Sequence, residues 1–129
     1  MQNLFLVAIG GAFGSCLRYL FFEMMVLWSR GNNFPLGTIL VNIIGSFLMG
    51  ILHFFLTNYM DSLSPQTRIL LATGVLGGFT TFSAFSLDTF RLINASQYGL
   101  AFAYIFSSVI FSILAIFFGF YISKMLFSV

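Results

Sequence analysis

Three polar side chains occur at regular spacing within an otherwise apolar stretch, residues 36–58. Thr38, Asn42 and Ser46 follow one another at intervals of four residues, so in a helix they would share one face. The Asn42 amide carries two N–H donors, which suit an anion at a depth where donors are scarce. An interhelical hydrogen bond, worth about 1 kcal/mol in a membrane, is the alternative role for Asn42.

A second regular set of hydroxyl groups occurs in the last apolar stretch, residues 98–127. Tyr104, Ser108 and Ser112 are again spaced at intervals of four, which predicts a row of hydroxyls about 12 Å long on one helix face. Such a row could supply donors to a permeating anion. The alternative is that the serines bond to backbone carbonyls one turn earlier, as serines in membrane helices often do.

The third apolar stretch, residues 69–90, is rich in glycine and hydroxyl residues at its centre. The segment 74–86 has the sequence GVLGGFTTFSAFS. Glycine disfavours helix, and serine and threonine offer the backbone competing hydrogen bonds. We therefore expect a helix broken near its centre, with free carbonyls that suit a cation and free N–H groups that suit an anion. An unbroken helix that packs closely through its small residues is the alternative.

One cation lies deep within the first apolar stretch, residues 4–27. Arg18 is well inside this stretch, where a charge is costly. It could extend to the membrane surface, pair with Glu23, or face an aqueous vestibule and attract anions there. The same stretch contains Gly10 and Gly14, a spacing typical of closely packed membrane helices.

The chain as a whole is too apolar to fold as a water-soluble protein. Its 129 residues are 60% hydrophobic and 6% charged, with a mean hydropathy of +1.05, whereas soluble domains carry about 25% charged residues. This composition excludes a cytosolic enzyme, a secreted disulfide scaffold and a disordered chain. The net charge of +2 is too small to indicate a nucleic-acid partner, and the lone Cys16 forms no intrachain disulfide.

Four stretches are long enough to cross a bilayer as helices, which requires about 20 apolar residues. They cover residues 4–27, 36–58, 69–90 and 98–127. We therefore expect residues 1–129 to form a single four-helix transmembrane domain of the all-α class. Pro65, with Ser64 before it as a helix cap, predicts that a helix begins just ahead of the third span.

The positive charges that flank the spans are evenly divided between the two sides of the membrane. Arg68 and Lys124 fall on the side of the termini, and Arg30 and Arg91 fall on the opposite side. The positive-inside rule therefore gives no orientation. Weak topology signals are one explanation. The other is that the chain inserts in both orientations and pairs with an inverted copy, which would build a midplane site from two chains.

The groups that most enzymes and coupled transporters need are missing from the spans. No span has a carboxylate at its centre, and the sequence contains no Cys/His metal cluster, phosphate-binding loop or nucleophile–base pair. We therefore expect no enzyme. Neutral donors, aromatic rings and one arginine suit a small anion better than a cation or a lipid. Two other functions stay open on the residues alone: a small dual-topology transporter of cationic or aromatic compounds, and a structural subunit whose polar residues only join helices.

Three motifs together resemble the Fluc (CrcB) fluoride channels of microorganisms. They are Gly10-Gly11-x-x-Gly14-x-x-x-Arg18-Tyr19, Gly37-Thr38-x-x-Val41-Asn42-x-x-Gly45-x-Phe47-x-x-Gly50, and the segment 77–86. They lie in three of the four spans, in the order in which the family has them. One position departs from the pattern, since Ala84 stands where the family usually has threonine. The departure removes one hydroxyl and puts a role for position 84 in doubt.

The resemblance implies an antiparallel, dual-topology homodimer in the bacterial cytoplasmic (inner) membrane, which exports fluoride passively through two pores. It also implies a structural sodium ion, held at the breaks in the third helix by the backbone carbonyls of Gly77 and Thr80 from both subunits. Arg18 is expected in a vestibule, and fluoride and membrane lipid are the other expected partners. The expected anion path comprises Asn42, Thr81, Phe82, Ser83, Phe85, Tyr104, Ser108 and Ser112.

Overall fold

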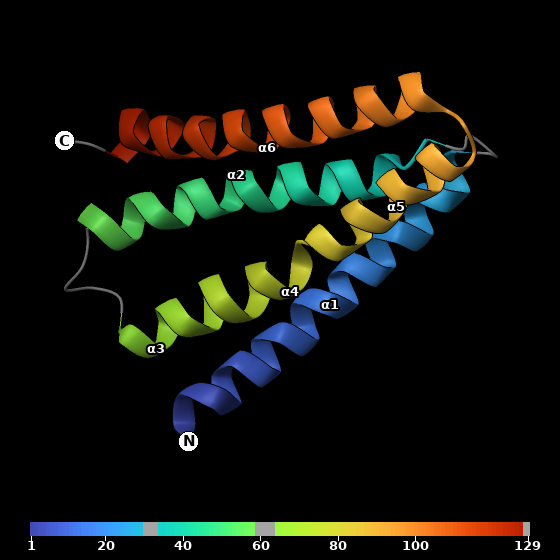
Figure 1. Ribbon diagram of the computed structural model, residues 1–129. Coiled ribbons are helices and arrows are strands. Elements are labelled where there is room, and N and C mark those ends of the chain that lie inside the picture. Colours follow the sequence, from blue (N-terminus) through green and yellow to red (C-terminus); the bar gives the residue numbers. More distant parts are fainter. Residues whose placement is uncertain (30–33, 59–63, 128–129) are drawn as a thin grey trace.

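The computed structural model describes residues 1–29, 34–58 and 64–127, nearly all of which are helical. Arg30, which entered the charge count, lies outside the described residues. In chain order the elements are α1 (Gln2–Ser29), α2 (Leu36–Asn58), α3 (Pro65–Arg68), the π-helix η1 (Ile69–Leu76), α4 (Gly77–Phe79), α5 (Phe82–Asn94) and α6 (Tyr98–Phe127) (Figure 1).

Four helical spans in the described part of the chain are long and apolar enough to cross a membrane. This confirms the expected all-α membrane fold. The third span, Pro65–Asn94, is composite and contains α3, η1, α4 and α5. Successive spans run in opposite directions, so both chain ends lie at the same end of the helices, and α2 and α6 run side by side in the same direction (Figure 1).

Glycines allow the helices to approach closely at two interfaces. Between α2 and α6, a Cβ atom at Gly50 would meet the backbone carbonyl of Ile116, and one at Gly119 would meet that of Phe47. These contacts fix the register of the two helices, because any larger residue would separate the backbones.

The first span packs in a similar way against the third. A Cβ atom at Gly10 would lie 2.7 Å from the carbonyl oxygen of Leu70, and one at Gly14 would meet the carbonyl of Val75. The close packing expected from the spacing of Gly10 and Gly14 is therefore confirmed. It holds η1 and α4 against α1, and so it fixes the position of the break that follows α4.

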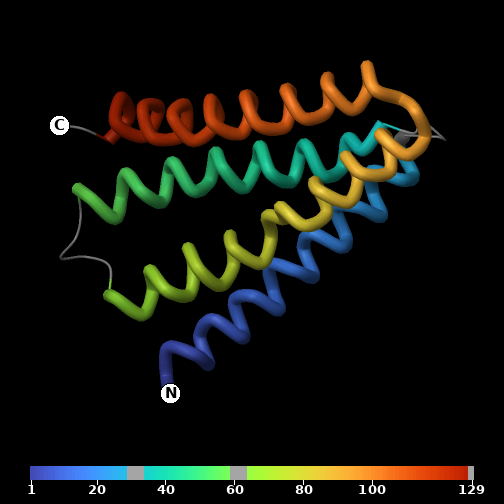
Figure 2. Tube along the Cα trace, viewed as in Figure 1, coloured from blue at the N-terminus to red at the C-terminus, as the bar shows by residue number. Residues whose placement is uncertain are grey.

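The third span begins with the expected cap and is then interrupted near its centre. The Thr67 N–H donates to Ser64 Oγ (3.2 Å), and Pro65 occupies the first turn, as the sequence predicts. Thr80 and Thr81 have extended backbones, with ψ angles of 159° and 114°. The helix is therefore broken rather than continuous, and the chain bends visibly between α4 and α5 (Figure 2).

Little of the apolar surface is buried within a single chain. A small core forms where α2, α5 and α6 meet, around Ile39, Leu92, Ala101 and Tyr104. Most large apolar side chains on the outer faces of α1 and α6 are exposed. In a membrane protein such surface faces lipid or another subunit.

Candidate functional site

A cavity of about 390 Å³ lies between α2, the break in the third span and α6. The rings of Phe82 and Phe85 border it, and no described residue that lines it is charged. It therefore combines neutral donors with aromatic edges, a set suited to a small anion. Its polar side chains are those of Asn42, Ser46, Thr80, Thr81, Ser108 and Ser112.

Asn42 joins α2 to the break by a pair of hydrogen bonds. The Thr81 N–H donates to Asn42 Oδ1 (2.8 Å), and Asn42 Nδ2 donates to the Thr81 carbonyl (3.1 Å). The break removes helical partners from both backbone groups, and a buried backbone group without a partner is costly. Asn42 thus makes the interhelical contact considered above. The second Nδ2 hydrogen has no acceptor among the residues described, and Asn42 lines the cavity.

Ser108 and Ser112 present hydroxyls to the cavity that the backbone does not use. Ser112 Oγ is buried without a hydrogen-bond partner within the described residues, and Ser108 is 4% exposed and likewise has none there. Ser123, farther along α6, donates to the Gly119 carbonyl one turn earlier (2.8 Å). The back-bonding alternative therefore applies to Ser123 but not to Ser108 and Ser112, whose O–H groups remain available to a ligand.

The two phenylalanines stand together at the side of the cavity. The ring centroids of Phe82 and Phe85 lie 5.3 Å apart. Phe85 also stacks on Tyr104 at 5.4 Å, which fixes it against the core. Phe82 is 77% exposed in the single chain, so its ring is held on one side only.

The hydroxyls of Thr81 and Ser83 are engaged at the start of α5. Thr81 Oγ1 accepts from the Ala84 N–H (3.1 Å) and lies 3.2 Å from Ser83 Oγ. Thr81 lines the cavity, whereas Ser83 is exposed and does not. The N–H groups of Phe82 and Ser83, in the first turn of α5, have no acceptor in the part of the chain that the structure describes. The break thus presents backbone donors as well as side-chain donors.

Arg18 lies at the break and not at the end of a helix. Its Nη1 donates to the Thr80 carbonyl (3.0 Å), and the side chain is half-buried. Glu23, the partner considered above, is exposed and makes no described contact with Arg18. The guanidinium therefore stabilises a carbonyl that the interrupted helix leaves without a backbone donor.

Comparison with known proteins decides the family. The CrcB-like protein family (Camphor Resistance, CrcB) matches residues 5–120. The chain belongs to this family. A protein named fluoride-specific ion channel FluC from Caulobacter sp. (strain K31) is 47% identical over 129 residues, which is 100% of both chains.

Other relatives carry the same name. FluC of Rhizobium meliloti (strain 1021) is 50% identical over 119 residues, 92% of this chain and 94% of that protein. FluC 1 of Methanosarcina acetivorans is 42% identical over 121 residues, 92% of this chain and 88% of that protein. Membership of the CrcB-like family identifies a multi-pass membrane channel protein and not an enzyme, as the sequence predicts.

Two backbone carbonyl oxygens at the break are candidate ligands for the expected sodium ion. The Gly77 carbonyl has no donor among the described residues, because the Thr81 N–H bonds to Asn42 instead. This exposed glycine oxygen fits a hard cation, which prefers oxygen ligands. The Thr80 oxygen accepts from Arg18 and retains one lone pair, so a cation there would share it with a positive group. Residues 1–29, 34–58 and 64–127 contain no cluster of acidic, His or Cys side chains that could hold a metal.

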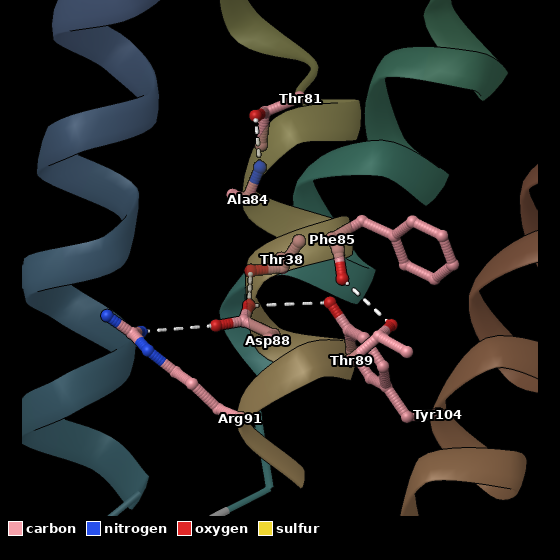
Figure 3. Close-up of polar contacts among 8 residues, drawn as sticks. All are labelled: Thr38, Thr81, Ala84, Phe85, Asp88, Thr89, Arg91 and Tyr104. Carbon is pink, nitrogen blue, oxygen red and sulfur yellow. Dashed lines mark hydrogen bonds and ion pairs between the residues drawn. The ribbon is translucent and has the colours of Figure 1, made fainter. Parts of the chain in front are cut away.

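Tyr104 belongs to a different polar cluster from the two serines of its helix. It is fully buried, does not line the cavity, and donates to Asp88 Oδ2 (3.4 Å). The Thr38 hydroxyl donates to the same oxygen (2.7 Å), and Arg91 lies 3.5 Å from Asp88 Oδ1 (Figure 3). Sequence reasoning gave Asp88 no role. The signal was present, since an ionisable residue within a membrane span is by default a functional candidate.

We expect Asp88→Ala to destabilise the protein, because it leaves the buried hydroxyls of Thr38 and Tyr104 without their acceptor. Each unsatisfied group costs about 1–3 kcal/mol, so the unfolding temperature in detergent should fall. Glu23→Ala is the matched control, since this acid is exposed on α1. Equal unfolding temperatures for the two variants would show that the Asp88 cluster adds nothing to stability.

Proposed function

We propose that the protein is a fluoride-selective channel through which fluoride leaves the cell passively. The observation that carries the proposal is the uncharged cavity with unused donors from Ser108, Ser112 and Asn42. The names of the full-length relatives support the same ion.

The chemistry of the cavity explains why an anion could pass without being trapped. Fluoride is small and strongly hydrated, so its water must be replaced by donors of similar quality. Serine O–H groups and the Asn42 amide supply such donors, and the rings of Phe82 and Phe85 add positive edges without a full charge. Conduction requires binding that is strong enough for entry and weak enough for release. Arg18, whose guanidinium bonds to the Thr80 carbonyl at the break, would add positive potential that attracts anions toward the site.

We further propose that two chains form an antiparallel, dual-topology homodimer with two pores, each chain being one domain of residues 1–129 in the cytoplasmic membrane. The even division of positive charge between the two sides supports both orientations. The exposed Phe82 ring supports a second chain, because in one chain it borders the cavity with most of its surface uncovered. The broad exposed apolar faces leave area for such an interface.

A structural sodium ion, bound at the breaks in the third spans of both subunits, completes the proposal. The carbonyls of Gly77 and Thr80 would hold it, with Thr80 shared with Arg18. When bound, such an ion supplies fixed positive potential near the cavity. The chain's own residues stabilise the break without the ion, because Asn42 bonds to the backbone of Thr81 and Arg18 bonds to the carbonyl of Thr80.

We expect the dimer to be more resistant to heat in sodium than in choline at equal ionic strength. A ligand at about 100 times its dissociation constant stabilises by about 2.7 kcal/mol. Size-exclusion chromatography after stepwise heating measures the fraction that remains dimeric. Monomer under all conditions would overturn the dimer. Identical melting in sodium and choline would overturn the cation site alone.

A flux measurement tests the main proposal. Purified protein in liposomes loaded with potassium fluoride should release fluoride once a potassium ionophore is added, as followed by a fluoride electrode. Vesicles loaded with chloride should retain it. Equal release of both ions would remove the selectivity. Retention of fluoride would instead favour a structural subunit, and proton-dependent flux of a cation would favour the small transporter.

A further inference from the structure

The close contacts between α2 and α6 determine which residues of the two helices face each other across the cavity. A Cβ atom at Gly50 would fall between the Ile116 carbonyl and the Phe120 N–H. One at Gly119 would fall between the Phe47 carbonyl and the Ile51 N–H. Gly50 and Gly119 are therefore level with each other, and the helices run in the same direction (Figure 1). Ser46 lies four residues before Gly50, and Ser112 lies seven residues before Gly119, close to the level of Asn42. Because all of these polar residues line the same cavity, their donors follow one another along it, from Ser108 through Asn42 and Ser112 to Ser46.

The Ser46 hydroxyl, like those of Ser108 and Ser112, lines the cavity and has no hydrogen-bond partner in the described segments. Ser46 is half-buried, whereas Ser112 Oγ, on the facing helix, is buried without a partner. Burial of a hydroxyl without a partner is unfavourable. Two unused hydroxyls on one cavity therefore favour a ligand that accepts hydrogen bonds.

We propose that Ser46 is a further fluoride-binding residue, which forms a second anion position one helical turn along α2 beyond Asn42 and Ser112. The proposal rests on the fluoride channel proposed above and adds a residue to its path. Four residues of helix correspond to about 6 Å along the axis. A fluoride ion without its water shell can cross this distance from one hydrogen-bond donor to the next. Ser46 supplies the donor of this position from α2, and Asn42 with Ser112 supplies the donors of the position before it.

The apolar end of the cavity limits where the path can continue. Beyond Ser46 the lining becomes Met49 and Ile116, and the backbones of α2 and α6 then meet at Gly50 and Gly119. An ion cannot pass between backbones in contact. The anion must therefore leave the second position sideways, across the face that a second subunit would cover, and Ser46 is the last donor among the described residues that line this cavity.

The test compares three substitutions by fluoride efflux from liposomes at low fluoride load. Ser46→Ala removes the donor, Ser46→Thr retains it, and Ser107→Ala is the matched control because Ser107 donates to the Tyr104 carbonyl (3.2 Å) and does not line the cavity. A hydrogen bond to an ion is worth enough to change affinity about tenfold or more. We expect efflux to fall about tenfold for Ser46→Ala, to fall clearly less for Ser46→Thr, which keeps the hydroxyl, and to stay near wild type only for Ser107→Ala.

The outcomes separate this inference from the proposed function. Efflux from Ser46→Ala equal to wild type means that the hydroxyl is satisfied by water only, and it overturns the role of Ser46 while leaving the channel. An equal loss for Ser46→Ala and Ser46→Thr also overturns it, because the effect then follows shape and not the O–H group. Wild-type vesicles that retain fluoride overturn the channel and this inference together. Size-exclusion profiles establish that each variant is folded.

Discussion

Replacement of Phe82 and Phe85 by isoleucine should abolish fluoride efflux while the protein stays folded and assembled. Isoleucine preserves the apolar character but has no positive ring edge for an anion. If the two rings together stabilise the passing anion by about 3 kcal/mol, their loss slows transport about 100-fold. Efflux from liposomes measures the rate, and size-exclusion chromatography measures assembly.

The single variants and a control distinguish a lost pore contact from a damaged fold. Phe82 is 77% exposed in one chain, so Phe82→Ile removes little packing, whereas Phe85→Ile also removes the stack on Tyr104. Phe90→Ile alters another exposed ring of α5 that does not border the cavity, and we expect normal efflux from it. Wild-type efflux from Phe82→Ile and Phe85→Ile would end the aromatic part of the proposed path.

The fold was largely predictable because its causes are local. Four apolar runs of membrane-spanning length must form helices, because in lipid a helix satisfies all the backbone hydrogen bonds of its own segment. The break was predictable from the glycines and hydroxyls of residues 74–86, since glycine weakens helix and Thr81 can cap the helix that restarts. The structure places the break at two residues, Thr80 and Thr81. The sequence predicted only that the break lies near the centre of the third span.

Partners across helices were harder to predict, because they depend on register and rotation that one sequence does not specify. The spacing placed Tyr104 in one row with Ser108 and Ser112, but the Tyr104 hydroxyl reaches Asp88 instead. A long side chain extends well away from its own position on the helix, so a shared face does not ensure a shared cavity. Arg18 likewise bonds to a carbonyl that is exposed only because the helix breaks.

The departure at Ala84 has a simple structural reading. The contact that residue 84 makes at the break is through its backbone N–H, which donates to Thr81 Oγ1 (Figure 3). Any residue with an N–H supplies this bond, so the missing hydroxyl does not weaken the cap. The Ala84 side chain faces a second cavity, which Asp88 also lines. A hydroxyl at position 84 would therefore add polarity near Asp88 and not beside Ser108 and Ser112.

The other large effect is expected from Asn42→Asp, which replaces the side-chain NH2 group by an oxygen where the break meets the cavity. The ionised aspartate can still accept from the Thr81 N–H, but it cannot donate to the Thr81 carbonyl or to an anion. It also places a negative charge in a cavity whose described lining has none. We expect fluoride efflux to fall to the leak of empty vesicles, with stability reduced by about 1–3 kcal/mol for the unpaired carbonyl.

Asn58→Asp provides the matched control, because it makes the same chemical change at the far end of α2, where Asn58 Nδ2 donates to the Phe54 carbonyl (2.9 Å). It should conduct fluoride normally even if it is slightly less stable. The two arms separate the roles of Asn42, since a residue that only joined helices would lose stability without losing transport. Folded Asn42→Asp protein that releases fluoride at the wild-type rate would therefore leave Asn42 as a link between α2 and the break, and the donors of the path would then be hydroxyls and backbone N–H groups alone.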